Sequence, residues 1–323
     1  MQAIVYHVYG PPSVLKLEEI KKPVCRDDEV LIKVRAASAN PFDWHFMRGE
    51  PYPLRLMAGV VMPRSPRLGA DVAGEVEAVG RNVSELKPGD AVFGACHGSF
   101  AEYACGSPSR LAIKPENVNF EHAASVGIAA TTALQALRDK GHIQSGQNVL
   151  VNGAAGGVGT FGVQIAKHFG AQVTGVCSTR NVEMVRSIGA DHVVDYTRED
   201  FTTLGQTYDL ILDCVGNHSL SAYRRVLSTT GIHVAAGGTA DRWMLGVLSQ
   251  KLASQVASWR GGQKFLGLLA RIHTQDLTLL GNLIQSGKVN PVIDRRYALG
   301  DVPAAIQYLE EGHARGKVVI SIH

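Results

Sequence analysis

The sequence lacks the features that mark a secreted, membrane-spanning or nucleic-acid-binding protein. Its net charge is only +3 over 323 residues and its lysines and arginines are not clustered, so no concentrated positive field is available for nucleic acid. The longest uncharged apolar run near the N-terminus, residues 56–62, is far shorter than the ~18 residues that indicate a spanning helix. The opening residues, MQAIVYHVYG, contain no cationic segment followed by an apolar one. These absences predict a cytoplasmic protein.

Cysteine is scarce and widely spaced. The five cysteines are Cys25, Cys96, Cys105, Cys177 and Cys214, and the closest two lie nine residues apart. This spacing excludes a CxxC redox motif and a close-spaced zinc knuckle. We therefore expect reduced and mostly buried thiols, because free cysteine behaves as a small apolar residue.

The first part of the chain has the pattern of a β domain. The length exceeds the roughly 100–200 residues of one domain, so two domains are expected. Up to about residue 120, short β-rich runs alternate with turns that contain Pro and Gly, which is typical of a mostly antiparallel sheet. The predicted strands cover residues 3–8, 29–36, 71–79, 91–94 and 100–104.

From about residue 121 the pattern changes to helices and strands in alternation. Predicted strands cover residues 148–151, 172–177, 192–194, 209–214, 231–235 and 264–270, and predicted helices cover residues 121–140, 157–170, 181–188, 219–227, 241–260 and 276–285. Such alternation implies a parallel sheet with both faces covered. The last elements, at 292–299, 302–311 and 317–322, resemble the β-rich part. We therefore predict an α/β protein with one domain formed by residues 1–122 and 286–323 and another by residues 123–285.

The strongest local motif is a glycine-rich turn between a predicted strand and a predicted helix, residues 152–159 (NGAAGGVG). Dinucleotide-binding folds hold a pyrophosphate at this position, where the helix N-terminus offers free N–H groups. Gly156 would let the backbone approach the anion and Gly159 would let the helix pack on the strand, although Ala154 replaces the usual first glycine. The alternative is a glycine-rich turn without a ligand. The predicted cofactor contacts are Ala155, Gly156, Gly157, Val158 and Gly159.

No carboxylate follows the next predicted strand, where NAD-binding domains usually place one for the ribose 2′-hydroxyl. The strand ends instead in Ser178, Thr179 and Arg180. A carboxylate would repel a 2′-phosphate, whereas a hydroxyl and a guanidinium would bind it through charge-assisted hydrogen bonds. The pattern favours NADPH over NADH. The alternative for Arg180 is a solvated helix-capping cation.

Blocks of sequence along nearly the whole chain resemble the medium-chain dehydrogenase/reductase superfamily, in its quinone oxidoreductase (zeta-crystallin-like) branch, and especially its chloroplast-envelope and enone/alkenal reductase members. The blocks are residues 40–44 (NPFDW), 68–74 (LGADVAG), 87–94 (KPGDAVFG), 100–103 (FAEY), 154–159, 189–196 (GADHVVDY) and 316–319 (GKVV). The resemblance implies a GroES-like β domain assembled from both ends of the chain. It also implies a doubly wound, parallel-sheet Rossmann domain that binds NADPH, and a homodimer.

The residues that hold catalytic zinc in the alcohol-dehydrogenase relatives are replaced in this chain. Asn40 stands at the first cysteine, residues 69–71 (GAD) stand at a Gly-His-Glu block, and the third ligand falls near Ile128. The four-cysteine structural lobe is also missing around Cys96 and Cys105. Zinc needs three or four N, S or carboxylate ligands, which these positions do not supply. We therefore predict no metal.

This loss directs the predicted chemistry. Without a Lewis acid, the oxidation of simple alcohols loses its main activator, whereas direct hydride transfer from NADPH to an electron-poor carbon remains feasible. Quinones and α,β-unsaturated carbonyl compounds fit, because hydride adds to the β-carbon and a proton from solvent or Tyr completes the reduction. Two alternatives stay open: a zinc-independent alcohol or aldehyde dehydrogenase, and a non-catalytic NADPH-binding protein.

The resemblance also implies site residues outside the glycine-rich turn. Asn40, Asp43 and Tyr52 are implied for catalysis or substrate contact, and the Asn40 amide is expected to meet the nicotinamide ribose or the substrate carbonyl. The implied cofactor contacts are Asn40, Thr132, Tyr196, Gly237, Gly238 and Lys317. The residues themselves predict the other contacts: Ser178 and Arg180 for the 2′-phosphate, and Cys214, Val215 and Gly216, which end a predicted strand at the carboxyl edge where open α/β sheets bind ligands.

Some of these interpretations have alternatives of a structural kind. Lys317 is equally consistent with a solvated cation at a strand edge, and Trp44 with a core residue. The predicted helix at 241–260 would either cap an apolar cleft or pack against the sheet or a dimer partner.

Overall fold

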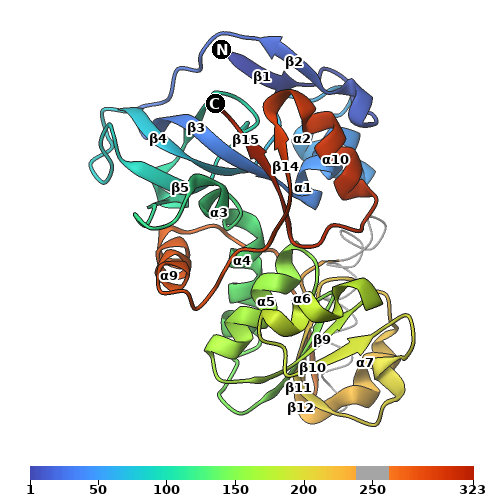
Figure 1. Cartoon of the computed structure of the whole chain (residues 1–323). Helices are drawn as coiled ribbons and strands as arrows, with labels where there is room; N and C mark the ends of the chain where they lie inside the picture. Colours follow the sequence, from blue (N-terminus) through green and yellow to red (C-terminus); the bar gives the residue numbers. More distant parts are fainter. Residues whose placement is uncertain (238–261) are drawn as a thin grey trace. The chain divides into compact units, whose positions relative to one another are not determined.

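The computed structural model describes residues 1–237 and 262–323, which form two compact units (Figure 1). The first unit contains Met1–Thr131, Arg271–Gly287 and Pro291–His323, and the second contains Thr132–Ala270 and Lys288–Asn290. The predicted helix at 241–260 and the cofactor candidate Gly238 lie outside the described residues. In residues 1–237 and 262–323, no helix combines the length and apolar character needed to cross a membrane.

The first unit is built on a seven-stranded sheet. Its strands run in the order β14 (Ile293–Ala298), β15 (Lys317–Ser321), β3 (Val30–Ala39), β4 (Asp71–Val79), β5 (Ala91–Ala95) and β7 (Leu111–Ile113), while β6 (Tyr103–Gly106) pairs with β3. β14 and β15 pair in parallel, and the other pairs are antiparallel. The predicted mostly antiparallel β domain is confirmed.

Both ends of the chain lie in the first unit, as the blue and red colours of Figure 1 show. β15 lies antiparallel to β3, with Val318 opposite Ala39 and Ser321 opposite Ala36. Near the N-terminus, β1 (Gln2–Val5) pairs with β2 (Lys16–Glu19). This sheet therefore brings residues of the last strand beside the end of β3, where the NPFDW block begins.

Helix α1 (Pro41–Arg48) starts directly after β3. Asn40 is its N-cap, Pro41 supplies a φ angle suited to the first helical position, and the Asp43 carboxylate accepts a 2.8 Å hydrogen bond from the Asn40 N–H. Gly49 ends the helix with a φ of +63°, a left-handed conformation that favours glycine. Local capping thus holds Asn40 and Asp43 at one end of a short helix.

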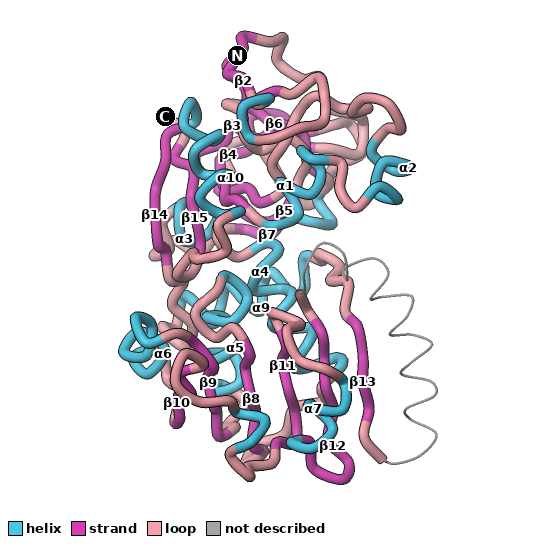
Figure 2. Tube along the Cα trace, turned by 90° about the vertical axis from the view of Figure 1, so that its right-hand side faces the viewer, coloured by secondary structure: helices cyan, strands magenta, loops and turns pink. Residues whose placement is uncertain are grey.

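The second unit contains a six-stranded parallel sheet (Figure 2). Its order is β10 (His192–Asp195), β9 (Gln172–Cys177), β8 (Asn148–Asn152), β11 (Tyr208–Asp213), β12 (Leu227–Ala235) and β13 (Lys264–Gly267). Helices α5 (Gly157–His168), α6 (Val182–Ser187) and α7 (Leu220–Val226) occur between successive strands. In order along the chain the strands are arranged 3-2-1-4-5-6, the order of the Rossmann fold. The predicted doubly wound sheet is confirmed.

Helix α9 (Thr274–Gln285) belongs to the first unit, although the boundary expected at residue 285 placed it with the parallel sheet. It packs against β5 and β7 with Leu277 and Leu280 fully buried. The Thr274 hydroxyl also donates a 3.0 Å hydrogen bond to the Pro108 carbonyl. The helical period of the sequence predicted the helix but contained no information about which sheet covers its apolar face.

The cysteine prediction is wrong at two positions. Cys25 and Cys105 form a disulfide, with Cα atoms 5.5 Å apart, that joins the segment before β3 to β6. The two residues are 80 positions apart and meet because β6 pairs with β3, so their spacing could not reveal the bond. The other three cysteines are reduced, as predicted. Cys96 and Cys177 are buried thiols, and Cys214 is a half-buried thiol.

Candidate functional site

The glycine-rich turn follows β8 and leads into α5, as its motif predicts. Gly153 has a φ of +84° and turns the chain, and the Gly156 N–H donates to the Gly153 carbonyl at 3.0 Å. A Cβ on Gly159 would lie 2.1 Å from the Gly153 oxygen, so glycine is required there for the helix to pack against the turn. Ala154 fits the usual first-glycine position because it faces Gly175, where a Cβ would lie 3.0 Å from the Ala154 Cβ.

Gly156 is different, because the fold itself does not require a glycine there. Its φ is −82°, and an added Cβ would meet no atom closer than the Gly153 oxygen at 3.5 Å. The space beside it lies at the N-terminus of a twelve-residue helix, where unpaired N–H groups and the helix dipole favour an anion. The turn therefore fits the pyrophosphate of a dinucleotide.

The ends of β9 and β10 gather the residues predicted for the 2′-phosphate. Ser178 follows β9 and caps the turn that holds Arg180, while Tyr196 follows β10 and donates its N–H to the Cys177 carbonyl at 3.0 Å. The Tyr196 side chain is exposed. The structure thus brings Ser178, Arg180 and Tyr196 to neighbouring strand ends.

A carboxylate that sequence reasoning did not place here, Asp195, lies at the end of β10. It accepts hydrogen bonds from the hydroxyls of Thr179 at 2.5 Å and Thr197 at 2.8 Å, and Arg198 lies 3.6 Å away. The hydrogen bonds from Thr179 and Thr197 lower the pKa of Asp195 below its usual range. Two hydroxyls and a guanidinium thus engage the Asp195 charge at the end of β10.

Further predicted cofactor residues lie beside the turn at the carboxyl edge of the sheet. A Cβ on Gly153 would be 2.7 Å from a methyl group of Val215, and a Cβ on Gly237 would be 2.5 Å from the Cys214 oxygen. Gly216 has a φ of +71° and continues this loop after β11. The loops after β8, β11 and β12 therefore meet, as expected for a ligand edge in an open α/β sheet.

A buried polar network beneath these loops was missed from the sequence. The Asp213 Oδ1 accepts hydrogen bonds from the N–H groups of Val215 at 3.1 Å and Gly216 at 2.9 Å and from the Asn152 side chain at 3.0 Å. Its Oδ2 lies 3.2 Å from the His233 Nε2. Burial alone would raise the pKa of Asp213, but hydrogen bonding and charge from His233, with the Gly216 N–H, lower it to about 2. One ionised carboxylate thus organises the loops after β8 and β11.

The first unit brings Asn40 and Lys317 together around Asp71. The Lys317 Nζ donates to the Asn40 Oδ1 at 2.6 Å and lies 3.3 Å from the Asp71 Oδ2, which also accepts from the Asn40 Nδ2 at 2.9 Å. The Lys317 side chain is only 2% exposed and that of Asp71 is 0% exposed. Lys317 is therefore a buried member of an ion pair, which excludes the alternative of a solvated cation.

The other predicted residues differ in burial. Asp43 is fully buried, and burial, with the nearby Asp71 charge, raises the pKa of its carboxyl to about 7 against the opposing Asn40 hydrogen bond. Its Oδ1 has no hydrogen-bond partner in the described part of the chain. Tyr52, in contrast, is 70% exposed and lies beneath the guanidinium of Arg55. Thr132 in α4 (Gly127–Gln135) is buried in the second unit.

The position of Trp44 agrees with the interpretation of this residue as part of the core, because Trp44 packs against the hydrophobic core of the first unit and stacks on His45.

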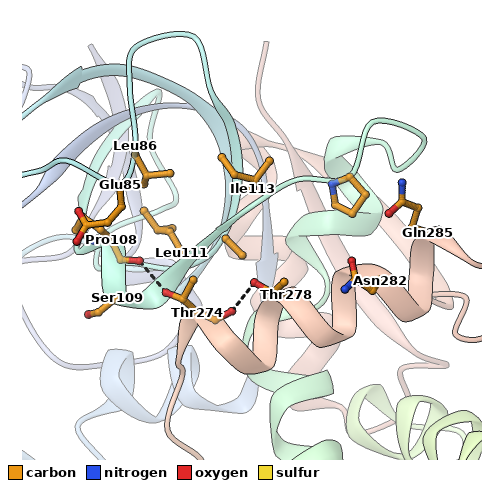
Figure 3. Close-up of a pocket in the computed structure, with 12 residues that line it drawn as sticks. Glu85, Leu86, Pro108, Ser109, Leu111, Ile113, Thr274, Thr278, Asn282 and Gln285 are labelled. Carbon is orange, nitrogen blue, oxygen red and sulfur yellow. Dashed lines mark hydrogen bonds between the residues drawn. The ribbon is translucent and has the colours of Figure 1, made fainter.

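A hollow of about 610 Å³ in the first unit lies between α9 and β7 and contains none of the predicted site residues (Figure 3). Thr274, Thr278 and Asn282 follow one face of α9, opposite Leu111 and Ile113. The Thr278 hydroxyl is already satisfied by the Thr274 carbonyl at 2.8 Å. Glu85 is the one ionisable residue among the described residues that line this hollow, so the candidate chemistry lies elsewhere.

Comparison with known proteins agrees with this geometry. Residues 26–117 match the family description "Alcohol dehydrogenase GroES-like domain" and residues 188–320 match "Zinc-binding dehydrogenase". The chain is 36% identical to the NADPH-dependent alkenal/one oxidoreductase of Arabidopsis thaliana, over 99% of this chain and 79% of the relative. It belongs to the quinone oxidoreductase branch of the medium-chain dehydrogenase/reductase superfamily. The resemblance predicted from the sequence blocks is confirmed.

Solved structures of quinone oxidoreductases extend the agreement to the whole fold. The enzyme from Coxiella burnetii superposes with a TM-score of 0.88 at 32% identity, covering 100% of this chain and 99% of that one. The Escherichia coli quinone oxidoreductase complexed with NADPH gives a TM-score of 0.81 at 25% identity, covering 99% and 100%. The GroES-like domain and the Rossmann domain of this quinone oxidoreductase family member are thereby confirmed.

The zinc named in one family description does not fit the residues of this chain. At the three positions compared above, Asn40 offers a neutral amide, Ile128 an apolar side chain, and Asp71 a carboxylate that already faces the Lys317 ammonium. Zinc needs three or four anionic or imidazole ligands. Within residues 1–237 and 262–323, one trio of Cys, His or acidic residues has the spacing of a metal site, Cys25, Glu29 and Cys105, and its two sulfurs are bonded to each other.

Proposed function

We propose that this chain is an NADPH-dependent oxidoreductase that reduces quinones or α,β-unsaturated carbonyl compounds. The observation that carries the proposal is the Rossmann turn, where Gly156 leaves open space at the N-terminus of α5 although the fold does not require a glycine. Near-full-length similarity to an alkenal/one oxidoreductase and to quinone oxidoreductases supports the substrate class.

The second unit supplies the proposed cofactor site. The turn of residues 155–159 binds the pyrophosphate, Ser178 and Arg180 bind the 2′-phosphate through charge-assisted hydrogen bonds, and Tyr196 lies beside the adenosine end. Val215, Gly216 and Gly237 line the carboxyl edge of the sheet, and Cys214 and Thr132 complete the proposed set. NADPH, when bound, supplies the hydride.

The first unit contains the polar groups that we propose for catalysis. Asn40 and Lys317 present a hydrogen-bond acceptor and a cation, and Asp43 lies beside them with a raised pKa. Tyr52, whose side chain is exposed, is the proposed substrate contact. Two-electron reduction consumes one hydride and one proton, so an enone becomes a saturated carbonyl compound and a quinone becomes a hydroquinone. We further propose a homodimer, with residues of both chain ends forming the catalytic domain.

The direct test is NADPH oxidation by the purified full chain against a panel of quinones, enones, enals and secondary alcohols, with metal analysis of the same sample. We expect turnover with quinones or enones at sub-stoichiometric zinc. Alcohol oxidation without quinone or enone reduction would instead identify a zinc-independent dehydrogenase. Tight NADPH binding without turnover of any acceptor would identify a non-catalytic binding protein.

The turn has its own test in two glycine variants. Gly156→Ala should keep the thermal midpoint of the wild type, since its Cβ meets only the Gly153 oxygen at 3.5 Å, but should weaken NADPH binding at least tenfold by blocking the approach of the anion. Gly205→Ala is the control, because it adds the same methyl group at a glycine away from the site. Its φ of +75° strains an alanine more than the backbone at Gly156 does. Unchanged NADPH affinity in Gly156→Ala would show that the pyrophosphate does not bind at this turn.

The cofactor preference is tested at Arg180. Arg180→Ala should weaken NADPH binding much more than NADH binding, because only NADPH carries the 2′-phosphate. Equal losses for both cofactors would show that Arg180 does not contact that phosphate. Dissociation constants from the quenching of intrinsic fluorescence measure both effects without an acceptor.

A further inference from the structure

We infer that Asp71 is a positioning residue, which fixes the Asn40 amide with its oxygen as the acceptor for a ligand hydroxyl and fixes Lys317 as the adjacent cation. The inference rests on the proposed function, in which Asn40 and Lys317 contact the cofactor or the substrate. Asp71 itself was not among the residues predicted for the site. It is the first residue of β4 and is fully buried.

The Asp71 carboxylate joins four segments of the first unit. Its Oδ2 accepts from the Ser38 hydroxyl at 2.7 Å and from the Asn40 Nδ2 at 2.9 Å, and it lies 3.3 Å from the Lys317 Nζ. Its Oδ1 accepts from the Ile128 N–H at 2.7 Å. Sheet register explains this convergence, because Ser38 on β3 is opposite Asp71 on β4 and β15 flanks β3 on its other side.

These contacts determine which way the Asn40 amide faces. Its Nδ2 donates one hydrogen to Asp71 and the other to the Ser38 carbonyl at 3.1 Å, while its Oδ1 accepts from Lys317. A flipped amide would place its oxygen against the Asp71 carboxylate and its NH₂ group against the Lys317 ammonium. Both arrangements are repulsive, so the ion pair fixes the orientation.

The remaining hydrogen-bonding capacity identifies the ligand group. Both amide hydrogens of Asn40 are used, and one lone pair remains on its Oδ1. Asn40 can therefore accept a hydrogen bond from a hydroxyl, and it cannot donate one to a carbonyl oxygen. Of the two partners expected from the sequence, this geometry selects a ribose hydroxyl of the cofactor over the carbonyl of the substrate. Lys317 uses two of its three hydrogens on Asn40 and Asp71 in the described part of the chain, which leaves one for an acceptor atom.

The burial of the ion pair permits a test that separates folding from positioning. Removing one partner of a buried pair leaves an uncompensated charge and destabilises the fold strongly, whereas removing both charges is often nearly neutral. Asp71→Asn and Lys317→Met should therefore each lower the thermal midpoint. The double variant Asp71→Asn/Lys317→Met should recover most of it. Asp27→Asn, at an exposed ion pair with Arg81, is the matched control for charge loss on the surface.

The functional readout is the dissociation constant of NADPH, measured by fluorescence without an acceptor, together with kcat and the KM of an enone. Asp71→Asn should raise the NADPH dissociation constant about tenfold, the equivalent of about 1.4 kcal/mol. Asn40→Ala should raise it similarly, and in both variants the KM of the enone should stay within twofold of the wild type. The double variant should regain thermal stability without regaining NADPH affinity.

Three outcomes would overturn the inference. One is an NADPH dissociation constant in Asp71→Asn within twofold of the wild-type value. Another is recovery of NADPH affinity together with stability in the double variant, which would indicate a purely structural role. The third is a rise confined to the KM of the enone, which would assign Asn40 to the substrate carbonyl. Failure of the wild type to bind NADPH, in contrast, would refute the proposed function itself.

Discussion

Replacing Asp43 by asparagine should make the stability of this protein less dependent on pH. Burial is the largest cause that raises the pKa of the Asp43 carboxyl to about 7, with the Asp71 charge adding to it and Lys317 opposing it. In the unfolded chain the carboxyl returns to its ordinary pKa of 3.8. The folded state therefore binds the proton more tightly, and the stability that Asp43 contributes is complete below pH 4 and is lost as the pH rises through about 7.

The size of the effect follows from the two pKa values. Each unit of difference corresponds to about 1.36 kcal/mol, so ionisation of this carboxyl costs about 4 kcal/mol when it is complete. Between pH 5 and pH 8 the loss is roughly 2–3 kcal/mol, because part of the titration lies below pH 5. The amide introduced by Asp43→Asn cannot ionise, and its oxygen can still accept the Asn40 N–H that caps α1. The variant should therefore gain stability relative to the wild type by that amount over this range.

The assay compares urea unfolding of the two proteins at intervals from pH 5 to pH 8. Their difference in unfolding free energy removes the contributions of all other titrating groups. Asp200→Asn is the control, because the Thr202 N–H lowers the pKa of Asp200 and its titration is complete below pH 5. That variant should show a constant difference from the wild type. A constant difference for Asp43→Asn as well would refute the assignment of a raised pKa and with it the burial argument.

Three other perturbations have definite expected results. Cys25→Ser removes the disulfide to Cys105 and should lower the unfolding free energy by about 4 kcal/mol, because the unfolded chain gains entropy. In thermal unfolding, the wild type treated with a dithiol reductant should have the same midpoint as this variant. Asp213→Ala should raise the NADPH dissociation constant at least tenfold in fluorescence titration, because the Gly216 N–H and its neighbours lose their acceptor. Gly159→Ala should lower the thermal midpoint and abolish NADPH binding together, since its Cβ would lie 2.1 Å from a backbone oxygen; a folded, NADPH-binding variant would contradict the packing argument.

Several parts of the fold were predictable because local sequence determines them. The strand predicted at 71–79 and the one predicted at 172–177 have the same bounds in the structure, since their apolar residues lie between clear turn signals. β2 was missed because its four residues, KLEE, are all exposed and show no apolar alternation. β7 was missed because three residues are too few to show a period.

The candidate site also has a part that local sequence determines and a part that it does not. The glycine-rich turn is contiguous, so its strand, turn and helix could be predicted from one motif. The contacts of Asp71 and Asp213 depend on sheet order, which brings Ser38 and Lys317 to one carboxylate and Asn152 and Gly216 to the other. No local pattern encodes those neighbours.

The position of β15 has a consequence for biosynthesis. The six strands of the parallel sheet lie between residues 148 and 267, so that sheet can form on the ribosome before β15 emerges. The antiparallel sheet needs its last strand, and the Lys317 contact with Asn40 spans 277 positions. The strands of this sheet within residues 1–131 therefore remain without β15, and Asp71 remains without Lys317, until residue 317 has been translated. Nascent chains stalled before residue 317 should consequently be far more sensitive to protease in residues 1–131 than in the parallel-sheet segment.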